Sequence, residues 1–222
     1  MLLTTGRARP RLSLTELWAC HDQSEWDYCA GALYESAVRP ERLELYRDLE
    51  TPGLSQRIAR MTTEEFYTFL YDDFFRWKFT VGPQLAGNRR MLATHLQDGS
   101  LDRIERVRGR LVDRGGDGKG SSIKMIMGRN GGIHGLGVPG ACGLLALVHP
   151  QEFGTVDVMV TRAMQLLGIV EADLVDPENI SVGDAVRLIE IMCMKAHDLN
   201  SIFGTDKWTP RRIDRVLWVA GR

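Results

Sequence analysis

A glycine-rich stretch that runs straight into an apolar segment constrains this chain more than any other feature. Residues 131–141 have the sequence GGIHGLGVPGA, and residues 141–148 are apolar throughout. Gly135 and Gly137 permit a tight turn, and Pro139 suits the first turn of a helix, where its missing N–H leaves nothing unpaired. The pattern predicts a hairpin whose free backbone N–H groups, together with a helix N-terminus, converge on an anion such as a phosphate.

An aspartate follows this hairpin and begins a second helical pattern. Asp157 lies 18 residues after Pro139, directly before apolar residues that are spaced as on one face of a helix ending at Gly168. Aspartate is a preferred N-cap, and a helix N-terminus favours negative charge. We therefore expect a capped helix with a carboxylate at its start.

The two segments together resemble the helix-hairpin-helix DNA glycosylase superfamily, which includes endonuclease III and the adenine, oxidised-guanine and alkylated-base glycosylases. The hairpin of that family follows the pattern LPGVGxKTA, against IHGLGVPGA at residues 133–141. Its catalytic stretch follows VDxHVxR, against VDVMVTR at residues 156–162, and ends in Leu-Gly, as residues 167–168 do. The distance between hairpin and aspartate also agrees with the endonuclease III type.

The resemblance implies an all-α fold with two helical lobes, a DNA-binding cleft between them, and base excision from double-stranded DNA with Asp157 as the catalytic carboxylate. The hairpin residues that would bind the DNA backbone are His134, Gly135, Gly137, Val138 and Gly140. The backbone carbonyls that would hold a structural monovalent cation, K⁺ or Na⁺, are those of Gly131, Ile133 and Leu136. No other cofactor is implied.

Three departures from the family pattern bear on the chemistry. Pro139 replaces the lysine that bifunctional members use as a Schiff-base nucleophile, so strand cleavage by that route is not expected. Met159 replaces a histidine, and the four-cysteine cluster of some members is missing, so no iron–sulfur cluster is expected. The resemblance therefore predicts a monofunctional glycosylase that hydrolyses the N-glycosidic bond of a damaged, modified or mispaired base.

Helical patterns fill the rest of the chain. Thr62 and Glu65 give a capping-box signature before apolar residues on one helical face, and no strand alternation is convincing. In the run 76–80, which mixes cations with aromatic residues, Trp77 is a candidate for a pocket that holds an extruded base. A buried helix end is the commoner origin of such a run.

The same patterns give an expected division of the chain. We expect residues 1–60 and 169–222 to form one helical lobe and residues 61–168 the other, with the helix-hairpin-helix motif at residues 123–149.

The charge of the chain is nearly balanced, so a DNA-binding surface has to be local. The formal net charge is -1, but residues 101–130 hold eight Lys or Arg residues against four Asp or Glu just before the hairpin. The four cysteines have no metal-ligand spacing and are expected to be reduced core residues. Because the sequence has no apolar signal region and no stretch of membrane-spanning length, we expect a soluble, cytoplasmic, nucleoid-associated monomer.

Two other interpretations of the central segment stay open. Gly135, Gly137 and Gly140 also fit the dinucleotide-binding pattern GxGxxG, but that motif requires alternating strands and helices. The second alternative is a non-catalytic DNA-binding protein, in which hairpin N–H groups bind a phosphate and Asp157 only caps its helix. The enzyme is favoured because Arg162 also stands in register with the family pattern.

Overall fold

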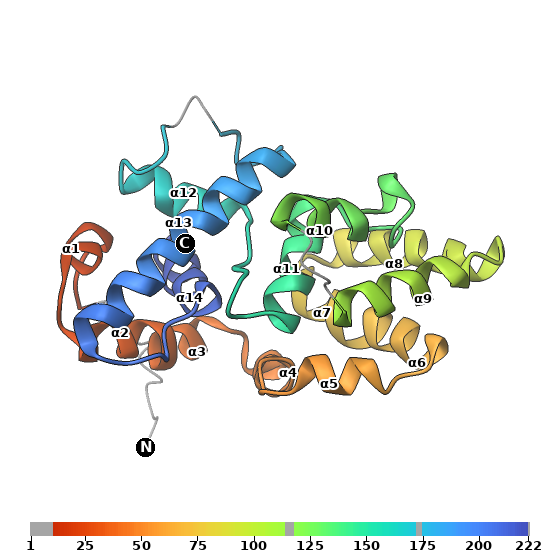
Figure 1. Ribbon diagram of the computed structural model, residues 1–222, viewed down its shortest axis with the longest axis horizontal. Helices are drawn as coiled ribbons and strands as arrows, with labels where there is room; N and C mark the ends of the chain where they lie inside the picture. Colours follow the sequence, from red (N-terminus) through yellow and green to blue (C-terminus); the bar gives the residue numbers. More distant parts are fainter. Residues whose placement is uncertain (1–10, 114–117, 172–174, 222) are drawn as a thin grey trace, which may run out of the picture.

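The computed structural model describes residues 11–113, 118–171 and 175–221, and every regular element within them is helical (Figure 1). The predicted all-α class is confirmed. An isolated bridge between Met127 and Ile133 accompanies the helices. Residues 114–117, which belong to the basic stretch noted above, lie outside the described residues. No helix in the described ranges is both long and apolar enough to cross a membrane.

The first half of the chain folds into α1 (Leu14–Ala19), α2 (Gln23–Tyr28), a π-helical turn (Cys29–Leu33), α3 (Tyr34–Ala37), α4 (Pro40–Leu49), α5 (Leu54–Ala59), α6 (Thr63–Thr68), a second π-helical turn (Phe69–Phe74) and α7 (Phe75–Lys78). The second half folds into α8 (Gly82–Gln97), α9 (Leu101–Val112), α10 (Lys119–Ile126), a 3₁₀ turn (Gly128–Asn130), α11 (Val138–Val148), α12 (Val158–Leu166), α13 (Val182–Phe203) and α14 (Pro210–Ala220).

Side-chain caps start the helices where the sequence predicts. Thr62 Oγ1 accepts a hydrogen bond from Glu65 N–H at 3.2 Å, and the Glu65 carboxylate accepts one from Thr62 N–H at 2.7 Å. Ser181 and Asp184 form the same capping box before α13. These bonds satisfy N–H groups that the first turn of a helix leaves unpaired.

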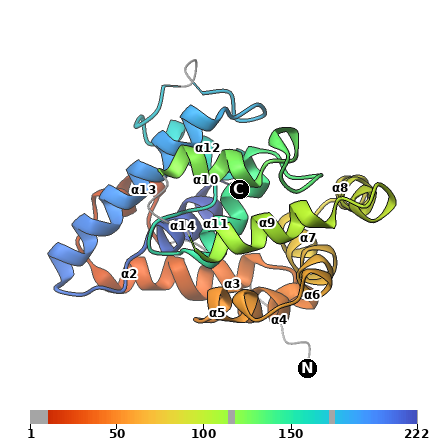
Figure 2. The ribbon, with the colours of Figure 1, turned by 45° about the vertical axis from the view of Figure 1, so that its right-hand side comes forward.

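The helices form two groups that meet at α11 and where α10 contacts α13. Helices α1–α3 lie with α12–α14, and helices α4–α10 lie on the other side (Figure 1). Helix α11 contacts α13 and α14 on one side and α5, α9 and α10 on the other, and it lies between α14 and α9 in both views (Figure 1, Figure 2). It is buried along nearly its whole length. A helix that is apolar all round needs such burial, so α11 joins both groups into one core.

This grouping differs from the expected boundaries at residues 60 and 168. Helices α4 and α5 contact α7 and α9, and α12 contacts α14. The chain therefore passes from one group to the other between α3 and α4, and returns between α11 and α12. The sequence alone could not supply this grouping, because an amphipathic pattern indicates which face of a helix is buried but not which helices bury it.

The cysteines are only in part the core residues that were expected. All four are free thiols; Cys29 and Cys142 are buried, whereas Cys20 and Cys193 are partly exposed. Burial raises the pKa of Cys142 to about 12. This thiol is therefore protonated at neutral pH, and it fills space in α11 as a small apolar side chain.

Candidate active site

A closed hairpin joins α10 to α11. Ile133 N–H donates to Ile126 O at 2.9 Å, and Gly128 N–H donates to Leu136 O at 3.0 Å. A Cβ added at Gly132 would lie 2.4 Å from Ile126 O. The two arms therefore approach closely only with glycine at this position, and the hairpin predicted before the apolar helix is present.

Gly135 fixes the hairpin against α8. Its φ is +89°, a conformation that favours glycine, and an added Cβ would lie 2.7 Å from Asn88 O. The glycine that the family pattern places here is therefore required for packing within the protein.

His134 was predicted to contact DNA, but the structure gives it partners inside the protein. Its backbone N–H donates to His95 Nε2 at 3.0 Å. Its ring lies 2.7 Å from Thr94 Oγ1 and 3.3 Å from an Arg103 nitrogen. Burial, together with the nearby His134 ring, lowers the pKa of His95, so that imidazole is neutral and can accept. His134 therefore anchors the hairpin, and its N–H is not free for a phosphate.

Three N–H groups at the start of α11 remain for an anion. The first N–H bonded within the helix is that of Ala141, which donates to Gly137 O at 2.9 Å. The N–H groups of Gly137, Val138 and Gly140 precede it and have no partner inside the helix, and Pro139 carries none. The space beside Gly137 is open, since an added Cβ would meet no atom within 4 Å. Three of the five predicted hairpin contacts thus keep a donor for a phosphate.

The carbonyls proposed for a monovalent cation serve the hairpin itself. Ile133 O accepts from Leu136 N–H at 3.1 Å, and Leu136 O accepts from Gly128 N–H. A cation held by Gly131, Ile133 and Leu136 would have to share two of its three oxygens with these bonds. The cation site stays a prediction.

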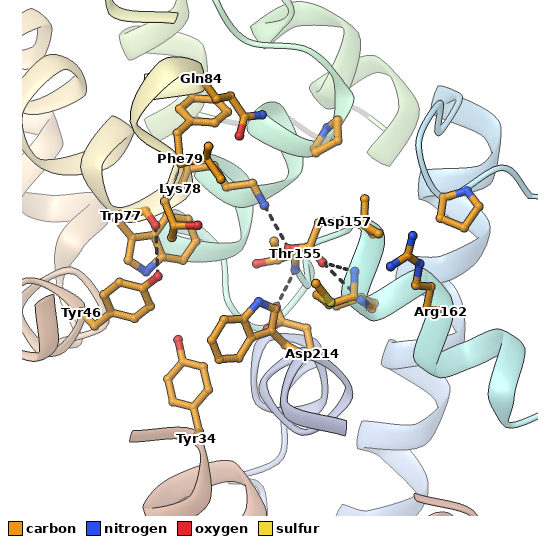
Figure 3. A pocket seen from close by; sticks show the side chains of 18 of the residues that line it. Tyr34, Tyr46, Trp77, Lys78, Phe79, Gln84, Thr155, Asp157, Arg162 and Asp214 are labelled. Carbon is orange, nitrogen blue, oxygen red and sulfur yellow. Dashed lines mark hydrogen bonds and ion pairs between the residues drawn. The ribbon is translucent and has the colours of Figure 1, made fainter. Parts of the chain in front are cut away.

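A cavity of about 590 Å³ lies between the N-termini of α11 and α12 (Figure 3). Pro139, in the first turn of α11, and Asp157, the N-cap of α12, both line it. Its aromatic walls are Tyr34, Tyr46, Trp77, Phe79 and Trp218, and its polar lining includes Gln84, Thr155, Arg162 and Glu178. The fold therefore brings the hairpin helix and the predicted catalytic aspartate to one cavity.

Asp157 divides its two carboxylate oxygens between the helix and the cavity. Oδ1 accepts hydrogen bonds from the N–H groups of Met159 at 3.0 Å and Val160 at 3.2 Å, so the predicted N-cap is confirmed. Oδ2 lies 3.6 Å from Lys78 Nζ, and the side chain is 24% exposed. The N–H groups of α12 thus fix the orientation of the carboxylate, and Oδ2 stays accessible to a ligand in the cavity (Figure 3).

Lys78 is the site residue that the sequence analysis missed. Its side chain is only 7% exposed, and it extends from the end of α7 to Asp157 across the cavity wall (Figure 3). The sequence signal was the mixture of cationic and aromatic residues at 76–80, from which Trp77 was predicted as a pocket residue and Lys78 was not. Which cation of such a run turns inward depends on how the helix packs.

Trp77 lines the cavity but belongs to its packed wall. The side chain is 4% exposed, and its ring centroid lies 5.9 Å from that of Tyr46 and 5.8 Å from that of Phe74. Tyr46 Oη donates to Trp77 O at 3.1 Å. Trp77 therefore bounds the cavity without standing free as a stacking platform, and its role in holding a base stays a prediction.

A buried charge network supports the floor of the cavity. Arg211 pairs with Glu50 and Asp214 and donates to Tyr34 Oη at 3.1 Å. Burial raises the pKa of Asp214 to about 6 despite the neighbouring guanidinium, so this carboxylate is ionised at neutral pH. The network ties α14 to α3 and α4.

The same network positions the segment that leads to Asp157. Thr155 N–H donates to Asp214 Oδ2 at 2.5 Å, and Thr155 Oγ1 accepts from Arg211 at 3.2 Å. Because Thr155 lies two residues before Asp157, these bonds fix the backbone that enters α12. Asp214 is 1% exposed and fully engaged, which leaves Asp157 and Glu178 as the carboxylates of the cavity lining that a ligand can reach.

Comparison with known proteins found no match: no protein family, no curated protein and no solved structure is similar enough to the chain to be matched.

Proposed function

We propose that the chain is a DNA N-glycosylase, which hydrolyses the bond between deoxyribose and a damaged, modified or mispaired base in duplex DNA. The observation that carries this proposal is the position of Asp157. One of its oxygens is held by α12, and the other faces a cavity that the first turn of α11 also borders. A carboxylate beside a helix start that can bind a phosphate is the combination that the resemblance to the glycosylase superfamily implies.

Binding would begin at the backbone of the DNA. The N–H groups of Gly137, Val138 and Gly140 donate to a phosphate, and the α11 dipole adds a favourable interaction with its charge. The target nucleotide then leaves the stack at a cost of a few kcal/mol, least for a mispaired or damaged base. The cavity of about 590 Å³ lies within the ordinary size range of ligand sites.

The chemical step uses the free oxygen of Asp157. As the N-glycosidic bond lengthens, the bonding electron pair leaves with the base and positive charge develops on the sugar, as in glycoside hydrolysis. The carboxylate stabilises this charge electrostatically. It also orients the attacking water and takes its proton, so that the products are the free base and an abasic sugar.

The two groups of helices correspond, in this proposal, to the two lobes of the family, with the DNA lying where they meet. The basic helix α9 adjoins the hairpin through Arg103, whose guanidinium lies 3.3 Å from the His134 ring. Positive charge beside the phosphate-binding turn favours DNA binding that weakens with salt. The partner is duplex DNA, bound by a monomer in the cytoplasm and nucleoid.

The direct test is a panel of duplex oligonucleotides, each with one uracil, alkylated, oxidised or mismatched base. Incubation with the protein, followed by alkaline cleavage and gel electrophoresis, scores abasic sites. We expect base release from at least one member. Binding of all members without release from any would support the non-catalytic DNA-binding alternative, and absence of both would refute the proposal.

Gly137→Asp is expected to weaken DNA binding roughly tenfold or more at physiological salt while leaving the fold stable. Gly137 is the N-cap of α11, with an extended backbone and open space beside it, and aspartate is a favoured N-cap. The new carboxylate would occupy the free N–H groups and repel a phosphate. Fluorescence anisotropy across a salt series measures the affinity, and thermal melting measures the stability.

Two glycine variants serve as controls. Gly137→Ala adds no charge and meets no atom, so it should bind DNA nearly as the parent does. Gly135→Ala should instead lose stability, because the Cβ would collide with Asn88 O and the left-handed backbone costs about 1–2 kcal/mol. An unchanged affinity and salt dependence in Gly137→Asp would show that the hairpin is not the anchor.

A further inference from the structure

The charged side chains that line the cavity form pairs of opposite sign. Among the described residues these pairs are Lys78 with Asp157, Arg211 with Asp214, and Arg162 with Glu178. Their formal charges cancel. DNA has one negative charge on each phosphate, so binding at this cavity requires a cation that the DNA backbone can reach.

Of the lining cations in the described ranges, Arg162 is the one that solvent reaches. Its side chain is 51% exposed, whereas those of Lys78 and Arg211 are each 7% exposed. A guanidinium nitrogen of Arg162 donates to Glu178 Oε1 at 3.1 Å, and the Glu178 side chain is 69% exposed. An ion pair between exposed side chains contributes little to stability. Arg162 can therefore exchange Glu178 for another anion at small cost.

The fold holds Glu178 beside Arg162. Gln165 Nε2 donates to Val175 O at 2.9 Å, which ties the segment that carries the glutamate to α12. Asp176 Oδ1 accepts from Glu178 N–H, also at 2.9 Å, and shapes the turn before it. These bonds place a carboxylate against the guanidinium where both side chains line the cavity.

The position of Arg162 on α12 suits a contact to the DNA backbone. Arg162 is four residues after Val158, and both line the cavity, so they share one face of the helix. Arg162 and Lys78 lie on opposite sides of Asp157 (Figure 3). An extruded nucleotide has one phosphate on the 5′ side of its sugar and one on the 3′ side. In the proposed function the N–H groups at the start of α11 bind one of them, and the second needs its own partner.

We propose that Arg162 binds the second phosphate of the extruded nucleotide, and that Glu178 occupies this phosphate site in the free protein. This inference rests on the proposed function. A guanidinium recognises carboxylates and phosphates alike through its planar set of N–H donors, so the Glu178 carboxylate takes the place of the phosphate. When DNA binds, Arg162 exchanges the carboxylate for the phosphate, and Glu178 turns towards water.

The test measures binding to a duplex with a single tetrahydrofuran abasic analogue, which needs no base release. Fluorescence anisotropy should show that Arg162→Gln binds roughly tenfold more weakly at physiological salt, and the slope of log K against log salt should become shallower by about 1. Glu178→Gln should bind a few-fold more tightly. Both variants should melt like the parent, because the pair is exposed.

The double variant shows whether Glu178 acts through Arg162. In Arg162→Gln/Glu178→Gln the gain from Glu178→Gln should disappear, because the carboxylate weakens binding by occupying the guanidinium. A gain that persists in the double variant would overturn the role of Glu178.

The matched control is an exposed ion pair outside the cavity lining. Arg47 and Glu35 lie 2.6 Å apart, and their side chains are 62% and 44% exposed. Arg47→Gln and Glu35→Gln make the same changes of charge and should leave the affinity for DNA unchanged. Changes as large as those in the Arg162 and Glu178 variants would overturn the inference, since they would reflect net charge alone.

Neutral methylphosphonates identify the phosphate that Arg162 binds. One methylphosphonate on the 5′ or the 3′ side of the analogue should weaken binding by the parent protein. At one position this loss should disappear in Arg162→Gln, and at the other it should disappear in Gly137→Asp. A loss that persists in Arg162→Gln at both positions, or an unchanged affinity of this variant, would overturn the inference and leave the glycosylase proposal standing.

The glycosylase proposal can fail separately. A loss mapped to Arg162, without base release from any duplex, would support the inference and refute the glycosylase. Absence of DNA binding by the parent protein would refute both.

Discussion

Asp157→Asn should bind duplex DNA with nearly the parent affinity and release the target base at least about a hundredfold more slowly. The amide oxygen can still accept from the N–H groups of Met159 and Val160, which now bond Oδ1. What disappears is the negative charge that faces the cavity. Single-turnover release of the base, measured beside the binding affinity, separates the two effects.

The matched control is Asp22→Asn. Asp22 caps α2 by accepting from Ser24 N–H at 2.8 Å, so the same chemical change is made at a cap outside the cavity. This variant should release the base at the parent rate. If Asp157→Asn also releases the base at the parent rate, Asp157 serves only as a helix cap. That result would support the alternative of a non-catalytic DNA-binding protein.

Arg211→Met should cost about 3–5 kcal/mol of stability and lower the melting temperature by about 10 °C. Methionine fills much of the volume but leaves Asp214 buried without its guanidinium, and Glu50 with Arg215 as its remaining cation. Loss of one partner from a buried ion pair leaves an uncompensated charge. Denaturant unfolding and thermal melting measure the change.

The stability lost in Arg211→Met should depend on pH. The pKa of Asp214 is already raised to about 6 by burial, and removal of Arg211 raises it further above the ordinary value near 3.9 of an unfolded chain. The folded variant therefore takes up a proton that the unfolded chain does not. Its stability is favoured at acidic pH and falls as the pH rises through the folded pKa. The difference in stability between the parent protein and Arg211→Met should therefore be larger at pH 8 than at pH 5.

Arg212→Met is the neighbouring control. Arg212 pairs with Asp27 at 3.2 Å, and both side chains are about one third exposed. Such a pair contributes about 1 kcal/mol or less. Equal losses of stability in the two variants would show that the buried network does not have the predicted role.

Local features of the site could be predicted from sequence because their geometry is set by adjacent residues. The N-cap of Asp157 and the capping box of α6 depend on side chains within three residues of the N–H groups they bind. The hairpin likewise follows from glycine, as at Gly135, where the backbone has a φ of +89°. These predictions were confirmed.

Contacts between distant segments could not be predicted in the same way. His134 had the position of a DNA contact in the motif, yet His95, on α8, accepts its N–H. Lys78 lies 79 positions before Asp157 in the sequence but 3.6 Å from it in space. Nothing in a local pattern indicates that two such side chains share a cavity, because their approach is decided by how α7 packs on α11.

The sequence by itself determined the helical class, the helix starts and the hairpin that leads into α11, because hydrophobic periodicity and capping act over a few residues. Tertiary structure alone decided which helices pack against one another, that the His134 N–H is bonded inside the protein, and that a buried lysine lies beside Asp157. The reason is physical: burial of an apolar helix face is favourable against any complementary surface, so the partner is selected only when the whole core packs.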